Sequence, residues 1–279
     1  MLIDLHCHSL KSDGKLSPTD LVNRAHEMGV NVLALTDHDT LNGLSEAKQQ
    51  AQKHNMQIIN GIEFSCVWNG MGIHIVGLGF DHKHPVMVDA VALQESRRQE
   101  RAVTIAARLE KKGAAGIWEK TLEISNGAQI GRPHFAQALI ELGKVSNMGQ
   151  AFKKYLGAGK PGDVKAQWPQ LNEVVEWIVQ SGGTAVIAHP DSYKLTRTKL
   201  KLLIEAFMAA GGGAMEATTA TMESSYRARM NELCIEYGLM ASQGSDFHGP
   251  TPWCELGRFN PLPETVKPVW SQWLWPSRL

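Results

Sequence analysis

Residues 2–39, LIDLHCHSLKSDGKLSPTDLVNRAHEMGVNVLALTDHD, hold the pattern that decides the fold class. The apolar runs at 2–5 and 30–36 predict two buried strands, because each is short and followed by polar residues. Ser17 is the expected N-cap of a helix between them, with proline at the next position, and Gly29 ends that helix. Both strands are followed by histidine, in the motifs H-C-H and T-D-H-D. A strand, a helix and a strand in this order favour a largely parallel α/β sheet.

The alternation of strands and helices continues after this unit. Residues 57–67 and 72–79 are predicted strands, and the Asn-Gly pair between them is typical of a type I′ hairpin turn. Helical runs and three further strands follow in the last third of the chain, the strands at 184–188, 214–217 and 239–243. About seven strands in all favour a closed or nearly closed barrel over an open sheet.

The middle of the chain has a different character. Residues 85–162 contain no convincing strand, and glycines separate their helical runs, which we expect at 86–112, 133–142 and 148–156. We therefore expect two units. A barrel is formed by residues 1–84 and 163–279, and an all-helical insertion domain at 85–162 contributes to the active site.

Composition and charge exclude several function classes. The 279 residues are 43% hydrophobic and 20% charged, as in ordinary folded proteins. Lys and Arg together number 28, as do Asp and Glu, and this balance argues against a protein that coats nucleic acid by bulk electrostatics. No run approaches the ~20 apolar residues of a membrane span, and the N-terminus is unlike a signal peptide. We expect a cytoplasmic protein with no membrane partner.

Five of the eleven histidines, His6, His8, His38, His189 and His248, follow the ends of predicted strands. Side chains two positions apart on a strand point to the same side, so His6 and His8 can share one metal ion. The loops at the carboxyl ends of barrel strands build the active site, so the other strand ends should deliver ligands to the same rim. Residues of ligand type at those ends are His38, His189, Asp246 and His248.

The hairpin predicts two more members of this group. With the Asn-Gly pair in the turn, Ser65 lies opposite His74, and Glu63 lies on the same face one diagonal step away. One metal ion can then take both Glu63 and His74. A shift of one residue in the register would move them to opposite faces, so the register is a specific prediction.

Eight motifs in order along the chain resemble those of the PHP (polymerase and histidinol phosphatase) superfamily: H-x-H, S-D-G, T-D-H, G-I-E, G-I-H, G-R-P-H, A-H-P and S-D-F-H. The resemblance implies a distorted (β/α)7 barrel that holds three divalent metal ions. It assigns the first ion to His6, His8, Glu63 and Asp246. The second ion would share Glu63 and add His74 and His134, and the third would bind Asp13, His38 and His248.

The helical insertion, its G-R-P-H motif, the following G-K-P-G and the late A-H-P are most similar to one group of that superfamily. These are the nucleoside 3′,5′-bisphosphate phosphatases and 5′-to-3′ exoribonucleases (RNase AM, or TrpH-like, proteins). The resemblance implies hydrolysis of nucleoside bisphosphates or 5′-phosphorylated short RNAs. Imidazole and carboxylate ligands suit Mn²⁺, Fe²⁺ or Zn²⁺, and we expect Mn²⁺. Metal ions held close together generate a hydroxide at neutral pH and clamp the attacking and leaving oxygens.

Three further residues are candidates for contact with the substrate. Arg132 can bind a phosphate through two parallel hydrogen bonds. His189 can donate to a phosphate oxygen or protonate the leaving group, or it can support the metal cluster instead. Lys160 is a second candidate for phosphate contact, or else a solvated loop residue. Tryptophans near the C-terminus can stack on bases, or pack the tail against the barrel, which we favour: Trp270, Trp273 and Trp275.

Two other functions compete with the leading one. The first is a phosphatase for a small metabolite of the histidinol-phosphate type, and the helical insertion with its G-R-P-H motif argues against it. The second is a metal-stabilised module of a larger nucleic-acid machine, and the complete set of ligand residues argues against that. We expect no obligatory protein partner.

Overall fold

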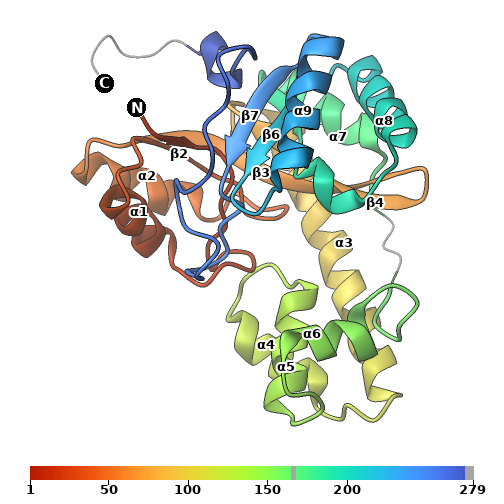
Figure 1. The fold of residues 1–279 in the computed structure, drawn as a ribbon. Coiled ribbons are helices and arrows are strands. Elements are labelled where there is room, and N and C mark those ends of the chain that lie inside the picture. The colour runs from red at the N-terminus through yellow and green to blue at the C-terminus, as the bar shows by residue number, and fades with distance from the viewer. Residues whose placement is uncertain (165–167, 274–279) are drawn as a thin grey trace.

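The computed structural model describes residues 1–164 and 168–273 of the chain. At its centre is one sheet whose strands lie side by side in chain order (Figure 1). They are β1 (Ile3–Asp4), β2 (Val32–Leu35), β3 (Gln57–Trp68), β4 (Met71–Leu78), β5 (Thr184–Ile187), β6 (Ala214–Thr219) and β7 (Met240–Gly244). The sheet nearly closes on itself, because the Leu5 amide after β1 donates to the Gln243 carbonyl of β7 over 3.1 Å. The predicted α/β barrel is confirmed.

Strand β4 runs antiparallel to both of its neighbours, and every other neighbouring pair is parallel. It forms the predicted hairpin with β3, in which Ser65 lies opposite His74. The turn residues Asn69 and Gly70 have φ of 47° and 74°, the left-handed values that a type I′ turn requires. The predicted register is therefore confirmed, and Glu63 shares a face of the hairpin with His74.

Helices cover the outside of this barrel. They are α1 (Pro18–Glu27), α2 (Leu44–Lys53), α7 (Leu171–Gln180), α8 (Arg197–Ala209) and α9 (Ser224–Tyr237). Helix α1 begins as the sequence predicts, with the Ser17 side chain accepting from the Asp20 amide over 3.0 Å. Two single 3₁₀ turns follow β5 and precede the C-terminus, η2 (Pro190–Tyr193) and η3 (Val269–Gln272). Within the described residues, no helix is both long and apolar enough to cross a membrane.

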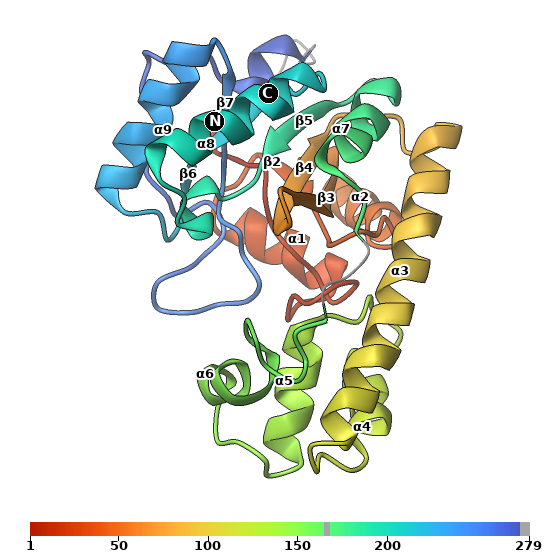
Figure 2. The same ribbon diagram turned by 90° about the vertical axis from the view of Figure 1, so that its right-hand side faces the viewer.

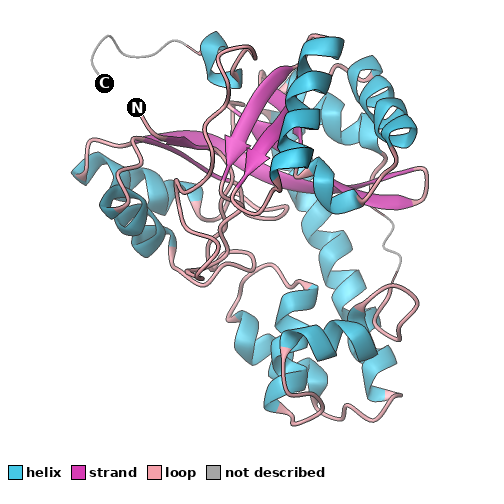
Figure 3. Cartoon of the chain, viewed as in Figure 1, coloured by secondary structure: helices cyan, strands magenta, loops and turns pink. Residues whose placement is uncertain are grey.

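The segment between β4 and α7 is helical and lies to one side of the barrel (Figure 3). It contains α3 (Pro85–Glu110), α4 (Ile117–Ser125), α5 (Arg132–Glu141), α6 (Met148–Ala151) and the π-helical turn η1 (Phe152–Leu156). Figure 2 shows α3 as a long helix that runs from beside the barrel into the rest of this group. The helices enclose a hydrophobic cluster of their own, which includes Ile105, Leu109, Ile117, Phe135 and Leu139. Helix α4 was not among the helices expected from the sequence.

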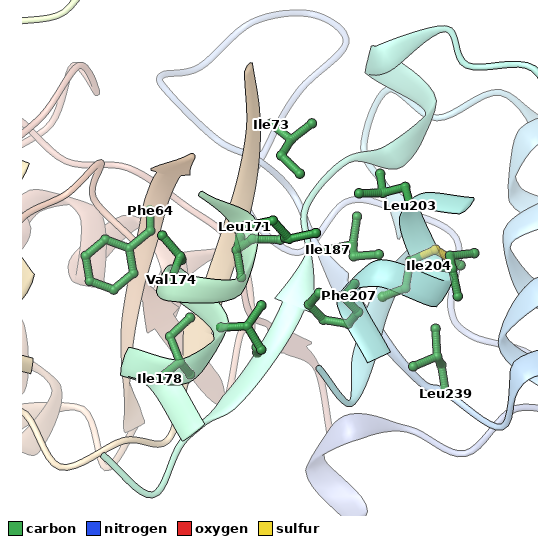
Figure 4. Packing of buried hydrophobic residues seen from close by; sticks show 14 of the residues in the cluster. Phe64, Ile73, Leu171, Val174, Ile178, Ile187, Leu203, Ile204, Phe207 and Leu239 are labelled. Atoms are coloured by element: carbon green, nitrogen blue, oxygen red, sulfur yellow. The ribbon is translucent and has the colours of Figure 1, made fainter. Parts of the chain in front are cut away.

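Separate hydrophobic clusters hold the barrel and its helices together. One lies between the sheet and helices α7 to α9, where Phe64, Ile178, Ile187 and Phe207 are fully buried (Figure 4). A second gathers apolar side chains from the strands themselves, and Val269 of η3 belongs to it. The partly buried Trp270 and Trp273 pack against this second cluster, as the preferred interpretation of the tail predicts. Trp275 lies outside the described residues.

Candidate metal centre and arginine pocket

The first group of ligand-type side chains comes from the ends of β1, β3 and β7. His6 Nε2 and His8 Nε2 lie 3.1 Å apart, so the two rings point at the same spot, as their spacing predicts. Glu63 Oε2 lies 3.4 Å from His6 Nε2 and 3.3 Å from His8 Nε2. Asp246 Oδ1 lies 3.5 Å and 3.4 Å from the same two nitrogens. The structure thus brings together all four residues expected at the first ion.

A second group forms on the other oxygen of Glu63. His74 Nδ1 lies 2.9 Å from Glu63 Oε1, as the hairpin register requires. His189 Nε2 lies 2.9 Å from that same oxygen. His189 follows β5, and its φ of 28° belongs to the left-handed side of backbone space, so the chain turns sharply there. Two imidazoles from different strands therefore meet at one carboxylate oxygen.

His134 is placed differently from the sequence-based assignment. It lies in the first turn of α5, where its Nδ1 accepts from the Gly131 amide over 3.0 Å. The described residues contain three groups of closely spaced ligand atoms, and neither His134 nor His189 belongs to any of them; the group on Glu63 and His74 is completed by His38. A side chain on the insertion, engaged in capping its own helix, is not brought to Glu63 and His74. His189, by contrast, lies with its Nε2 2.9 Å from Glu63 Oε1.

The third group lies beside the first. Asp13 Oδ1 is 3.3 Å from His248 Nε2, and Asp13 Oδ2 is 3.7 Å from His38 Nε2. His8 joins this group as well, because its Nδ1 lies 4.0 Å from Asp13 Oδ1. The three residues expected at the third ion are therefore together, and His8 links them to the first group.

The donor set fits divalent cations. Several of its buried atoms have no hydrogen-bond partner: His8 Nδ1, Asp13 Oδ1, His38 Nδ1 and Glu63 Oε2. Buried polar atoms are nearly always paired, so a cluster of unpaired nitrogen and carboxylate oxygen atoms points to cations as their partners. The thiol of Cys7 takes no part, because it donates to the Ala34 carbonyl over 3.2 Å.

Charges within the cluster also favour cation binding. Burial raises the pKa of Glu63, but the neighbouring histidines, His38 first, outweigh it and hold that pKa well below its usual range. Burial lowers the pKa of His248, but Asp13 raises it to about 10. The Glu63 carboxylate likewise raises the pKa of His189 to about 9, against the effect of burial. The carboxylates are therefore ionised, and positive charge is stabilised between them.

Two buried carboxylates that were not expected from the sequence orient the ligand-type side chains. Glu216 Oε1 lies 2.8 Å from His6 Nδ1, and its other oxygen accepts from the His189 amide. Asp37 accepts from the Ser9 and Ser12 hydroxyls, each over 2.6 Å, and so fixes the loop that leads to Asp13. Glu216 is the one charged residue of strand β6, and a charge within a buried strand is the signal in the sequence that could have identified it.

A pocket lined by arginines lies directly beside the metal-type residues. Its cavity of about 180 Å³ is bounded by Asp13, Ser65, His38 and His74 from the barrel and by Arg98, Arg101, Arg132, Phe152 and Trp168. We call the last five residues the arginine pocket. The guanidinium carbons of Arg98 and Arg101 lie 5.4 Å and 5.9 Å from the centre of the Trp168 ring. Of these residues, only Arg132 was expected from the sequence.

The arginine pocket is positively charged and short of anions. Burial lowers the pKa of Arg101 to about 10, and the adjacent charges of Arg132 and Arg98 act in the same direction. Mutual repulsion of this kind is relieved by a bound anion. Lys160 lies elsewhere, on an exposed loop at a separate basic hollow with Arg108, Lys111 and Lys112. The structure therefore does not bring Lys160 to the metal-type residues.

Positive charge is concentrated on the insertion as a whole. Residues 85–162 contain twelve Lys and Arg and seven Asp and Glu, whereas the entire chain contains 28 of each kind. The remaining residues therefore carry a net negative charge, and the metal-type cluster lies among them. The neutral total hides a strongly uneven distribution.

Comparison with known proteins decides the family. A model of the PHP domain matches residues 4–180, which is more than half of the chain. The chain belongs to the PHP domain family. A 5′-3′ exoribonuclease of Haemophilus influenzae is 45% identical over 269 residues, which are 96% of this PHP chain and 98% of the relative. A 3′,5′-nucleoside bisphosphate phosphatase of Chromobacterium violaceum is 40% identical, over 97% of this chain and 95% of the relative.

Solved structures agree with this assignment to the PHP family. An amidohydrolase of Chromobacterium violaceum, solved with bound sulfate and no metal, superposes with a TM-score of 0.91 at 40% identity, covering 97% of this chain and 95% of that one. A metal-dependent phosphoesterase of Bifidobacterium adolescentis gives a TM-score of 0.80 at 25% identity, covering 96% of this chain and 92% of that one. The helical insertion is thus shared with solved relatives, since both alignments cover nearly the whole chain.

Proposed function

We propose that this PHP protein is a metal-dependent phosphoesterase that hydrolyses 3′,5′-nucleoside bisphosphates and removes nucleotides from the 5′ end of short, 5′-phosphorylated RNAs. One observation carries the proposal: the arginine pocket and the metal-type cluster border the same cavity. A nucleotide with two phosphates, one on each side of its ribose, needs two adjacent phosphate sites of this kind. The names of the similar proteins support the same substrates.

The arginine pocket would hold the 5′-phosphate. A phosphate monoester carries close to two negative charges at neutral pH, and guanidinium groups bind its oxygens with paired hydrogen bonds. Arg98, Arg101 and Arg132 supply three positive charges, and the buried Asp39 beside Arg98 offsets one of them. With Asp163 acting on Arg101 and Arg132, the three guanidinium groups still outnumber the two carboxylates beside them. A substrate with a 5′-hydroxyl would leave these arginines unpaired.

The other side of the cavity would hold the phosphate that reacts. We propose three divalent ions, most favourably Mn²⁺, with the first on His6, His8, Glu63 and Asp246 and the third on Asp13, His38 and His248. For the second ion we propose Glu63 with His74 and His189, in place of the His134 expected from the sequence, because His189 reaches the shared carboxylate oxygen. Such ions supply a nucleophile at neutral pH and stabilise charge on the phosphoryl oxygens.

The protein's own residues position these partners. Glu63 is 1% exposed and lies between the groups, so its two oxygens fix the spacing of everything bound around it. Glu216 sets the ring orientation of His6, and Asp37 sets the position of the Asp13 loop. Arg132 stays a proposed phosphate contact, and Lys160 is not included. The proposed location, consistent with an RNA or nucleotide substrate, is the cytoplasm.

A substrate comparison tests the proposal. The protein is loaded with Mn²⁺ and given 3′-phosphoadenosine 5′-phosphate, a short RNA with a 5′-phosphate, the same RNA with a 5′-hydroxyl, and histidinol phosphate. We expect turnover of the first two, with release of mononucleotides from the 5′ end of the RNA. Turnover of histidinol phosphate alone would refute the proposal, and Glu63→Gln is the inactive control.

A further inference from the structure

Asp37, His38 and Asp39 are consecutive, but their side chains serve three different parts of the molecule. Asp37 holds the loop before Asp13, and His38 enters the metal-type cluster. Asp39 lies on the opposite side, where its carboxylate is fully buried against α3. Its φ of 53° lies in the left-handed region. Asp39 lies outside the metal-type cluster and forms an ion pair with Arg98 of the arginine pocket.

The Asp39 carboxylate is the point at which three elements are joined. Oδ1 accepts from the Ser65 amide of β3 over 2.8 Å and from Gln94 Nε2 of α3 over 2.7 Å. Oδ2 accepts from Arg98 Nε over 2.6 Å. The backbone amide of Asp39 donates to the Glu63 carbonyl over 3.0 Å. The residue therefore connects the strand that carries Glu63 to the helix that carries Arg98.

This contact also determines how Arg98 faces the cavity. Nε is engaged by Asp39, and Nη2 donates to Ser65 Oγ over 3.1 Å. Nη1 has neither partner and points toward Gly131, where an added Cβ would lie 3.9 Å from it. Gly131 precedes Arg132, and Arg98 and Arg132 line the same cavity. Without its carboxylate partner, a side chain that is only 7% exposed would lose this fixed direction.

We propose that Asp39 is a positioning residue for recognition of the 5′-phosphate: it holds Arg98 in the orientation that binds the phosphate and ties the arginine pocket to the metal-bearing strand end. The inference rests on the proposed function. It implies that discrimination between 5′-phosphate and 5′-hydroxyl ends depends on a carboxylate that touches neither the substrate nor a metal ligand's side chain. Asp39 acts on the phosphate through Arg98.

The test compares Asp39→Asn with Asp37→Asn. Asparagine tolerates left-handed backbone, so the first substitution removes charge with little cost to the local conformation. Each variant replaces one buried carboxylate next to His38. Asp39→Asn weakens the contacts to α3, whereas Asp37→Asn weakens those to the loop before Asp13. We expect Asp39→Asn to raise KM for 5′-phosphorylated RNA by roughly tenfold to hundredfold, the effect of losing one charge-assisted hydrogen bond. Activity on 5′-hydroxyl RNA should change by less than about threefold, because that substrate has no 5′-phosphate for Arg98 to bind.

Asp37→Asn should behave in the opposite way. It loosens the Asp13 loop, so we expect lower kcat and weaker metal retention with an unchanged preference for the 5′-phosphate. Arg98→Gln provides a second control, because the double variant Asp39→Asn with Arg98→Gln should be no worse than Arg98→Gln alone. An unchanged preference in Asp39→Asn, or additive losses in the double variant, would overturn the inference.

A binding measurement separates this inference from the proposed function. Adenosine 5′-monophosphate is titrated calorimetrically into the wild type and both single variants. If the wild type cleaves no nucleotide substrate, the proposed function fails, but weaker binding in Asp39→Asn than in Asp37→Asn still supports the positioning role. Equal binding in both variants refutes it. If Asp39→Asn does not fold, Ser65→Ala removes only the second contact to Arg98 and must still weaken binding.

Discussion

Replacement of His189 or His134 by alanine distinguishes two possible ligands of the second ion. The sequence motifs favour His134, and the structure favours His189. His189 Nε2 lies 2.9 Å from the Glu63 oxygen that His74 also approaches, whereas His134 Nδ1 is occupied by the Gly131 amide. His189→Ala should therefore release one ion per chain, and His134→Ala should retain all of them.

The size of the effect follows from the number of ligands lost. The proposed second ion has three protein ligands, and His189→Ala leaves only Glu63 and His74. Loss of a residue that merely orients a ligand costs about 10–100-fold in metal affinity. Loss of a direct ligand should reach at least the upper end of that range, about 100-fold or ~2.7 kcal/mol. His134→Ala should change metal affinity by less than about threefold, which is within the scatter of substitutions away from a site.

Metal content after dialysis against a fixed concentration of free Mn²⁺ provides the assay. Inductively coupled plasma mass spectrometry gives ions per chain, and circular dichroism establishes that each variant is folded. With the free Mn²⁺ concentration near the wild-type dissociation constant, a 100-fold loss of metal affinity empties the site almost completely. Loss of an ion from His134→Ala together with full occupancy in His189→Ala would refute the assignment and restore the one expected from the sequence motifs.

Four further predictions concern stability and the cluster. Gly244→Ala would put a Cβ 2.4 Å from the Cβ of His6 and 2.6 Å from its amide nitrogen, so we expect a loss of ~1–3 kcal/mol and of bound metal, measured by urea unfolding and metal analysis; wild-type values in both would contradict this. Phe207→Ala empties a fully buried site and should cost ~3–5 kcal/mol with metal content unchanged; a cost below ~1 kcal/mol would mean that the site collapses. Chelation of the metal should lower Tm, because ligands that bind only the folded state stabilise it; an unchanged Tm would count against metal binding to the folded cluster. In the metal-free protein, the pKa of His248 is about 10 and that of His189 about 9, both raised above the unfolded value of ~6.5. Their stabilising contribution is therefore complete below pH ~6.5 and lost as the pH rises through about 9 to 10, so the urea midpoint should fall over that window; a midpoint that rises there would refute the assignment.

Local signals in the sequence were enough to predict the barrel and to bring together most of the proposed ligand residues. An Asn-Gly turn permits only one register for the hairpin, so the position of Glu63 relative to His74 follows from counting. Strand periodicity likewise places His6 and His8 on one side. Helix α4 escaped notice because glycines on both sides of it were interpreted as breaks, whereas Gly116 begins the helix with a φ of 75°.

Contacts between distant segments were harder to predict. The choice between His134 and His189 depends on whether a helix of the insertion or the end of β5 reaches Glu63. The spacing of residues along the chain does not indicate which of the two lies closer. Arg98 and Arg101 form no motif on α3, so their approach to Arg132 was visible only once the insertion had been placed against the barrel. Asp39 was quoted within a motif, but its partner lies 59 positions away.

The concentration of Lys and Arg on the insertion leaves the two parts of this neutral molecule with net charges of opposite sign. An approaching polyanion attracts the positive part of the protein and repels the negative part. The two molecules therefore tend to meet with the insertion facing the polyanion. Association with RNA should therefore slow as ionic strength rises and the Debye length falls below ~10 Å, although the net charge is zero. Net charge describes how the whole molecule migrates in a field, and the uneven distribution of that charge determines how it meets its substrate.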